Sequence, residues 1–315
     1  MFANINKSVN QNGLVCTFFV MCLIIFTALR HDFFSAGNFH SILLTAVPVG
    51  LIAIGECICI MGGYFEMSVG MVSSIAGLCC AYVMEYTGSV LLSLSAGIIF
   101  GMLAGIIAGL AVSRLNMNAF ITTFALQEIY RGFLYMTTSG MSKSLVAPSF
   151  DPLTKWGQMK VLGVQFPIWV MLLIYLICAL FMKYTQTGRK IYLIGNNAKA
   201  AYIGGIDVHN TRLLLFIICD VLAAIAGMLV TMRTASAAPF GGGTYCMEAI
   251  AATILGGTSM MGGKGNLWMT FLGVIIIYVI KNGLIMIGLQ DYYQYVAIGA
   301  ILIFAVIIQT DKKKA

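Results

Sequence analysis

The sequence has little charge. Asp, Glu, Lys and Arg make up only 9% of its 315 residues, whereas a soluble domain usually carries about 25%, so a water-soluble globule is excluded. The net charge of +7 is spread thinly through apolar sequence, which also excludes a disordered chain and a basic tail that binds nucleic acid. Because 60% of the residues are hydrophobic, we expect an integral membrane protein that contacts lipid and forms one transmembrane domain over residues 1–315.

Histidine and the usual catalytic motifs are also scarce. The three histidines lie in predicted loops. The sequence shows no Ser-His-Asp set, paired acidic motif or HExxH helix, so we expect no enzyme. The nine cysteines are odd in number and lie almost entirely in apolar stretches. They do not indicate a disulfide framework, and without neighbouring histidines they predict no metal site.

One glycine-rich stretch superficially resembles a nucleotide-binding loop. Counting back from Lys264, the first glycine position of G-x-x-x-x-G-K-[ST] holds Thr258, and Gly265 stands where Ser or Thr is required. We therefore expect no ATP site and no cofactor on this chain.

Long apolar runs dominate the sequence. A helix needs about 20 apolar residues to cross the hydrocarbon core of a bilayer, and about ten runs between polar or Gly/Pro-rich breaks approach this pattern, the eighth being the weakest. The predicted spans are 13–29, 42–61, 69–87, 89–112, 119–138, 164–182, 213–232, 248–261, 267–287 and 292–309. The sequence thus predicts an all-α polytopic membrane helix bundle with broken or re-entrant segments.

The distribution of Lys and Arg predicts the orientation, because these residues are enriched on the cytoplasmic side of membrane proteins. Placing both termini in the cytoplasm puts most of the basic residues on that side. This orientation makes 183–212, the largest polar segment, a cytoplasmic loop and makes 139–163 an external loop.

Glycine marks a packing seam in the fourth predicted span. Gly97, Gly101, Gly105 and Gly109 recur every four residues, so they share one helix face and allow a neighbouring backbone to approach closely. Contact within the chain is favoured over a dimer interface, because a bundle of this size offers many internal partners.

The hydrophobic pattern also breaks at two Gly-Gly sequences, near 61–70 and 255–265. Irregular backbone at membrane depth is tolerated only where it is buried in protein or lines a cavity. The breaks therefore predict either a transport pathway or ordinary tight turns. The candidate pathway residues are Gly62, Gly63, Glu66, Ser68, Gly256, Gly257, Thr258 and Ser259.

The candidate intramembrane polar sites are three of the acidic residues inside predicted spans, namely Glu56, Glu128 and Asp220. A charge at the bilayer centre costs about 2.5 to 3.5 kcal/mol, so each should pair or face a cavity. Glu128 has a candidate partner in Arg131, three residues away on the same helix face. Glu56 and Asp220 lack such a local partner, so they are candidates for a pathway or for an interhelical contact, for example with Lys281.

Several stretches together resemble the permease subunit of ribose-type bacterial sugar importers of the ATP-binding-cassette class. Residues 187–197 resemble T-x-x-G-R-x-[IV]-Y-A-I-G-G-N, and 245–265 resemble Y-E-L-D-A-I-A-A-x-x-x-G-G-T-S-x-x-G-G-x-G. In the first half, 62–70 resemble G-G-I-D-L-S-V-G, and 118–132 resemble N-x-F-I-A-T-L followed by R-G. The similarity extends over nearly the whole chain.

This resemblance implies a multi-pass subunit of the bacterial cytoplasmic (inner) membrane that carries a monosaccharide or similar small polar solute inward. It implies pairing with a second permease copy, delivery of solute by an extracytoplasmic sugar-binding protein, and binding of a separate cytoplasmic ATPase that holds ATP and Mg. It also implies that segment 183–212 couples to the ATPase. The residues that match the family's docking motif are Ala200, Ala201, Gly205 and Ile206.

The sequence departs from the family pattern at four places. Ala198-Lys199 replaces the usual Glu-Glu, Glu66 occupies the acidic position of the first break, and Glu56 and Asp220 stand where the family has uncharged residues. The solute therefore stays open, and a signalling furanone or a nucleoside is an alternative cargo. An ion-coupled secondary transporter, with Glu56, Glu128 or Asp220 relaying protons, is an alternative mechanism.

Overall fold

The computed structural model describes residues 2–290 and 292–311, and nearly all of this backbone is helical. The longer helices are α1 (Phe2–Leu29), α2 (Ala36–Met61), α3 (Val69–Thr87), α4 (Val90–Ser113), α5 (Ala119–Thr138), α7 (Phe166–Tyr184), α10 (Val208–Thr234), α12 (Leu267–Met286) and α13 (Tyr292–Asp311). The short helices are η1 (His31–Phe34), η2 (Pro148–Phe150), α6 (Asp151–Gln158), α8 (Gln186–Asn196), α9 (Ala198–Ile203) and α11 (Tyr245–Leu255). The strands are β1 (Lys143–Ser144), β2 (Lys160–Val161), β3 (Val164–Gln165) and β4 (Ser236–Ala237).

A helix coincides with each predicted span, and the expected all-α polytopic membrane bundle is confirmed. Within the described residues, six helices are long and apolar enough to cross a membrane: α2, α3, α4, α7, α10 and α12. The predicted count of ten spans is not confirmed. The eighth predicted span, 248–261, forms only α11, whose 11 residues rise roughly 16 Å, about half the hydrocarbon thickness.

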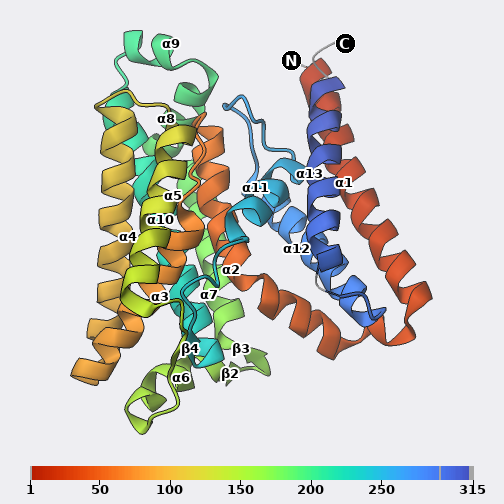
Figure 1. Cartoon of the computed structure of the whole chain (residues 1–315). Coiled ribbons are helices and arrows are strands. Elements are labelled where there is room, and N and C mark those ends of the chain that lie inside the picture. The colour runs from red at the N-terminus through yellow and green to blue at the C-terminus, as the bar shows by residue number, and fades with distance from the viewer. Residues whose placement is uncertain (1, 291, 312–315) are drawn as a thin grey trace.

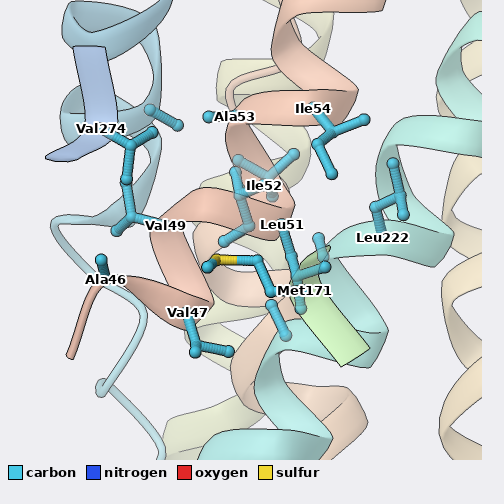
Figure 2. Packing of buried hydrophobic residues seen from close by; sticks show 14 of the residues in the cluster. Ala46, Val47, Val49, Leu51, Ile52, Ala53, Ile54, Met171, Leu222 and Val274 are labelled. Atoms are coloured by element: carbon cyan, nitrogen blue, oxygen red, sulfur yellow. The ribbon is translucent and has the colours of Figure 1, made fainter. Parts of the chain in front are cut away.

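Helix α2 runs through the centre of the bundle. Nearly all of its second half is buried, because its side chains are apolar all round rather than on one face. Figure 2 shows Val49 of α2 beside Val274 of α12, with Leu222 of α10 on the opposite side of α2. Pro48 lies inside the helix, and α2 bends along its length (Figure 1). A bend is expected in a helix where proline removes one backbone donor.

The glycine seam of α4 packs within the chain, as expected. A Cβ atom on Gly101 would lie 2.8 Å from the carbonyl oxygen of Asp220, and one on Gly105 would lie 2.6 Å from Cα of Ile217. The absent side chains therefore let α4 and α10 approach backbone to backbone.

The helices form two groups (Figure 1). Helices α3, α4, α5 and α10 surround one side of α2, while α1, α12 and α13 lie on the other, with α11 between the groups. The start of α1 and the end of α13 lie at the same end of the molecule as α8 and α9, and α6 with the β2–β3 hairpin lies at the opposite end.

Both long polar connections are structured. Segment 139–163 holds η2, α6 and two strands, of which β1 pairs antiparallel with the distant β4 through Lys143 and Ala237. Segment 183–212, predicted as a loop, instead folds into α8 and α9 and includes the start of α10. Side-chain caps explain these helices, because Thr185 accepts from the backbone of Gly188 and Asn197 from that of Ala200.

Candidate functional site

Each Gly-Gly sequence ends a helix. Gly63 and Gly257 adopt left-handed backbone, with φ of +89° and +86°, after α2 and α11 respectively. At the end of α2, the N–H of Gly63 donates to Ile60 and that of Tyr64 to Cys59; the same pattern ends α11. This is the glycine C-cap of many helices, and it also ends α9 and α12. The two breaks therefore share the same helix-end chemistry.

The two breaks meet on α8. The N–H of Gly263 donates a 2.8 Å hydrogen bond to the carbonyl of Met61, the last residue of α2. Gly195 of α8 packs against both residues so closely that a Cβ atom there would lie 2.6 Å from the nitrogen of Gly263 and collide with the oxygen of Met61. Asn196 donates from Nδ2 to the carbonyl of Gly263 at 3.4 Å. The end of α8 is thus a joint between the two breaks.

Tyr192 adds a second contact between α8 and the later break. Its hydroxyl donates to the carbonyl of Gly265 at 3.3 Å. Burial raises the pKa of Tyr192, so the phenol stays protonated and keeps its donor. Helix α8 therefore holds 263–265 through both a backbone contact and a side-chain hydrogen bond.

Three carboxyl groups are buried next to this joint. Glu56 of α2 and Asp220 of α10 are fully buried, and within the described residues none of their side-chain oxygens has a hydrogen-bond partner. The two helices cross here, since a Cβ atom on Gly55 would lie 2.8 Å from Cα of Cys219. Glu66 is also fully buried and near enough to the other two for their charges to interact. We call Glu56, Glu66 and Asp220 the carboxyl cluster.

Glu66 differs from the other two members of the cluster because it has partners. One carboxylate oxygen accepts hydrogen bonds from the Ser68 backbone N–H at 2.9 Å and from the Ser68 hydroxyl at 2.6 Å. Both residues lie in the first break, so the irregular backbone at 62–68 places a polar group in the core. Within the described part of the chain, no group of His, Cys, Asp and Glu side chains is arranged to hold a metal ion.

The predicted pathway residues of the second break contact α2 beside the cluster. The Thr258 hydroxyl lies 3.4 Å from the sulfur of Cys57, the residue after Glu56, and Thr270 donates to the same sulfur at 3.2 Å. Thr258 is buried, while Gly257 and Ser259 are half-buried. Both breaks therefore flank one region of α2.

Glu128 does not join the cluster. It lies on the outward face of α5 and pairs with Arg131 at 3.1 Å, which confirms the predicted local ion pair. The two side chains are 45% and 41% exposed. The opposite face of α5 turns inward, where Thr123 accepts from the backbone of Met67 at 3.0 Å and the Tyr130 hydroxyl is buried without a partner among the described residues.

The structure reveals a buried ion pair that the sequence left unassigned. Lys281 of α12 donates to both carboxylate oxygens of Glu248 of α11, at 2.9 and 3.0 Å, and the Tyr278 hydroxyl donates to the same carboxylate at 3.0 Å. Lys281 therefore does not pair with Glu56 or Asp220. An acidic and a basic residue in neighbouring apolar runs were the only sequence signal, and their separation of 33 positions hid the pairing.

The residues matching the docking motif lie at the exposed end of the molecule. Ala200 and Gly205 are exposed, Ile206 is half-buried, and Ala201, on the inner face of α9, is buried. Gly205 has a φ of +81°, which explains why glycine is needed at this turn.

A basic cavity of about 430 Å³ lies beside these residues. Lys199, His209 and Arg212 line it. The nearby carboxylate of Asp207 caps α10 by accepting from the backbone and side-chain amides of Asn210 at 3.0 and 2.6 Å. Because Lys199 and Arg212 outnumber this one carboxylate, the surface around α9 carries a net positive charge.

Comparison with known proteins shows what the chain is similar to. The sequence model of a family described as branched-chain amino acid transport system / permease component matches residues 38–306. The ribose import permease protein of Bacillus subtilis is 33% identical over 293 residues, which cover 93% of this chain and 90% of the relative. The L-arabinose transport system permease protein of Escherichia coli is 31% identical over 309 residues, or 97% and 92% of the two chains. The D-allose transport system permease protein of Escherichia coli is 32% identical over 294 residues, or 92% and 89%.

Proposed function

Because the chain belongs to the family of branched-chain amino acid transport system permease components, we propose that it is the membrane-spanning subunit of an ATP-binding-cassette importer for a monosaccharide. The names of its relatives support a pentose or hexose, since they are permeases for ribose, L-arabinose and D-allose. As a transport component, the chain is not an enzyme. A separate ATPase binds ATP and Mg, and this chain carries no cofactor.

The arrangement of the ends supports an orientation with both termini in the cytoplasm of a bacterium. The start of α1 and the end of α13 lie at the same end as the basic helices α8 and α9, and basic residues favour the cytoplasmic side. In this orientation the ATPase docks on Ala200, Ala201, Gly205 and Ile206. The opposite end, with α6 and the β2–β3 hairpin, then receives solute from an extracytoplasmic sugar-binding protein.

One observation supports coupling of the ATPase to the pathway: helix α8 contacts both breaks. Since Gly195 touches Met61 and Gly263 without intervening side chains, a displacement of α8 by the ATPase moves the end of α2 and the segment after α11 together. The carboxyl cluster lies directly beyond this joint. ATP hydrolysis thereby changes the access of solute to buried polar groups, which is what alternating access requires.

The outward face of α5 supports pairing of two permease copies. Glu128 and Arg131 lie in the middle of a helix of 20 residues and are nearly half exposed in the single chain. Charged groups at membrane depth face a protein partner or a water-filled cavity rather than lipid. We therefore place the second copy against the outward face of α5.

Two other functions stay in competition. The unpartnered carboxyls of Glu56 and Asp220 favour an ion-coupled transporter, because buried acids in membranes often relay protons. The family pattern has uncharged residues at both positions. The two carboxyls therefore also support a different polar cargo, such as a furanone or a nucleoside.

Uptake by vesicles tests these proposals. The chain is reconstituted with its ATPase and binding protein, and labelled ribose, arabinose, allose and other sugars are tested with and without ATP. We expect accumulation of one sugar that needs ATP and the ATPase and survives a protonophore. Accumulation without the ATPase that collapses with the proton gradient would establish the ion-coupled mechanism instead, and ATP-driven uptake of a nucleoside or furanone alone would correct the cargo.

A further inference from the structure

A cavity of about 550 Å³ opens between the end of α7, the start of α8 and the start of α12. Its lining combines two cations with aromatic and apolar side chains, among them Leu180, Lys183, Tyr184, Arg189 and Trp268. None of the residues of the carboxyl cluster lines it. Tyr192 and Gly265, which join α8 to the second break, form part of its wall, but the transport mechanism derived above gives the cavity itself no role.

The cavity lies at the boundary of the membrane. Helices α7 and α12 are both long and apolar enough to span a bilayer, and the last turn of one meets the first turn of the other here. A site at the ends of two spanning helices faces the level where the hydrocarbon core gives way to lipid headgroups. Trp268 is half exposed and Tyr184 more so, as is typical of aromatic side chains at this level.

The two cations of the cavity lack an anion. Lys183 and Arg189 are both exposed, and among the described residues neither forms an ion pair and no Asp or Glu lines the cavity. Both side chains contact Tyr184. The Lys183 ammonium lies 5.1 Å from the centre of the Tyr184 ring, and the Arg189 guanidinium donates to the Tyr184 backbone carbonyl at 3.5 Å. The site is therefore built to attract a negative group.

An apolar stripe leads from this charged end into the membrane. Its members are exposed and follow the i, i+3, i+4, i+7 spacing of one helix face on α7: Leu173, Leu176, Ile177 and Leu180. Leu176 and Leu180 also line the cavity, so the stripe and the cations form one continuous surface. This surface is amphiphilic, because it carries two cations at one end and apolar side chains along the rest of its length.

We propose that this cavity binds an anionic phospholipid, with its phosphate diester between Lys183 and Arg189 and an acyl chain along the α7 stripe. Basic pockets between spanning helices at the membrane surface favour anionic headgroups. A free phosphate would satisfy the cations but leave the stripe uncovered, so the amphiphilic surface favours the lipid. The inference rests on insertion of the helices in a membrane and not on the identity of the solute.

Trp268 gives a local readout. Trp156 and Trp169, the other two tryptophans of the chain, are replaced by Phe, and the full-length protein is placed in phosphatidylcholine vesicles. Brominated phosphatidylglycerol or brominated phosphatidylcholine is then titrated in, since bromine quenches only nearby tryptophan. We expect Trp268 to be quenched preferentially by the phosphatidylglycerol.

The double variant K183Q/R189Q tests the charges. Each basic group near an anionic lipid contributes about fivefold, so the preference for phosphatidylglycerol should fall about 25-fold. The control K155Q/K160Q removes the same charge from two exposed lysines in the α6–β2 region, at the opposite end of the molecule, and should keep the preference. If the double variant does not fold, the two single variants should each lose about fivefold.

Several results would overturn the proposal. Equal quenching by both lipids, or an equal loss in K155Q/K160Q, would show that there is no specific site. Displacement of the brominated lipid by inorganic phosphate or glycerophosphate would assign the cavity to a soluble anion. Quenching that K183Q/R189Q leaves unchanged, together with weaker ATPase binding, would assign the cations to docking of the ATPase. Uptake of solute is not measured, so failure here leaves the proposed transport function intact.

Discussion

The backbone N–H of Gly263 donates to the carbonyl of Met61 across 2.8 Å, and Gly195 of α8 fills the space beside this bond. Three segments far apart in the sequence thus meet without a side chain between them. Such backbone contacts transmit displacement directly, because there is no flexible group to absorb it. The end of α8 is therefore the place where a movement imposed from outside the membrane reaches both breaks.

We expect Gly195→Ala to reduce ATP-driven uptake about tenfold. The new Cβ atom would collide with the Met61 carbonyl, and overpacking against backbone typically costs about 1 to 3 kcal/mol, here by separating α8 from the breaks. The matched control is Gly37→Ala in the first turn of α2, where a Cβ atom meets nothing within 4 Å. Uptake by vesicles and thermal unfolding in detergent are measured for both. Wild-type uptake by the Gly195 variant would contradict a coupling role for this contact.

A second prediction concerns the Glu248–Lys281 ion pair. Lys281→Met should strongly destabilise the protein, by about 3 to 5 kcal/mol, because it leaves a buried carboxylate without its cation. The double variant E248Q/K281M should recover much of this loss, since it removes both charges. Thermal unfolding of the two single variants and the double variant in detergent gives the coupling free energy. A double variant whose loss of stability equals the sum of the two single losses would show that the pair contributes little.

Much of the fold follows from hydrophobic length and helix-end chemistry. The predicted ranges 69–87 and 119–138 coincide with α3 and α5, because each helix ends at a glycine or serine that adopts left-handed backbone, and α5 also begins at the capping residue Asn118. The eighth span was wrong in length because the apolar character continues past Leu255, whereas the helix stops at the Gly256-Gly257 cap. A hydrophobic run does not reveal where a glycine pair turns the chain within the membrane.

The site was less predictable than the fold. The sequence singled out Glu56, Asp220 and the residues of both breaks, and the structure places these near one another, but their roles stay predictions. It missed the joint at Gly195 and the pairing of Glu248 with Lys281, because each depends on contacts between segments that are distant in sequence. Glu128 was assigned the same potential role as Glu56, since the hydropathy of a span does not distinguish an inward face from an outward one.

Neutralising the unpartnered carboxyls should not destabilise the protein. Glu56 and Asp220 lie near Glu66, Asp220 makes no side-chain hydrogen bond with the described residues, and Glu56 has only a weak contact with the backbone of Glu66. Glu56→Gln and Asp220→Asn therefore remove repulsion and at most one weak hydrogen bond. We expect unfolding temperatures equal to or above that of the wild type, with ATP-driven uptake lowered about tenfold because the polar lining changes. Glu248→Gln is the control, and it should lower the unfolding temperature because its carboxylate is paired. Loss of stability in the Glu56 and Asp220 variants would point to partners that bind these groups.

The basic surface around α9 leads to the final prediction. Lys199 is exposed on the predicted docking segment, beside a cavity that Arg212 and His209 also line, whereas the family pattern has glutamate at this position. We therefore expect the ATPase of this transporter to present acidic groups there.

Lys199→Glu should weaken the association of the ATPase with the permease about tenfold at low salt, because one attraction becomes a repulsion. The difference from the wild type should shrink as ionic strength rises, since exposed charges are screened beyond about 10 Å at 0.1 M salt. Co-purification of the ATPase measures the effect, and Lys160→Glu, an equal charge change at the opposite end, serves as the control. Unchanged or tighter binding by the Lys199 variant would mean that the ATPase does not read this charge, and that docking depends on the apolar contacts of α9, where Tyr202 and Ile203 are 67% and 79% exposed.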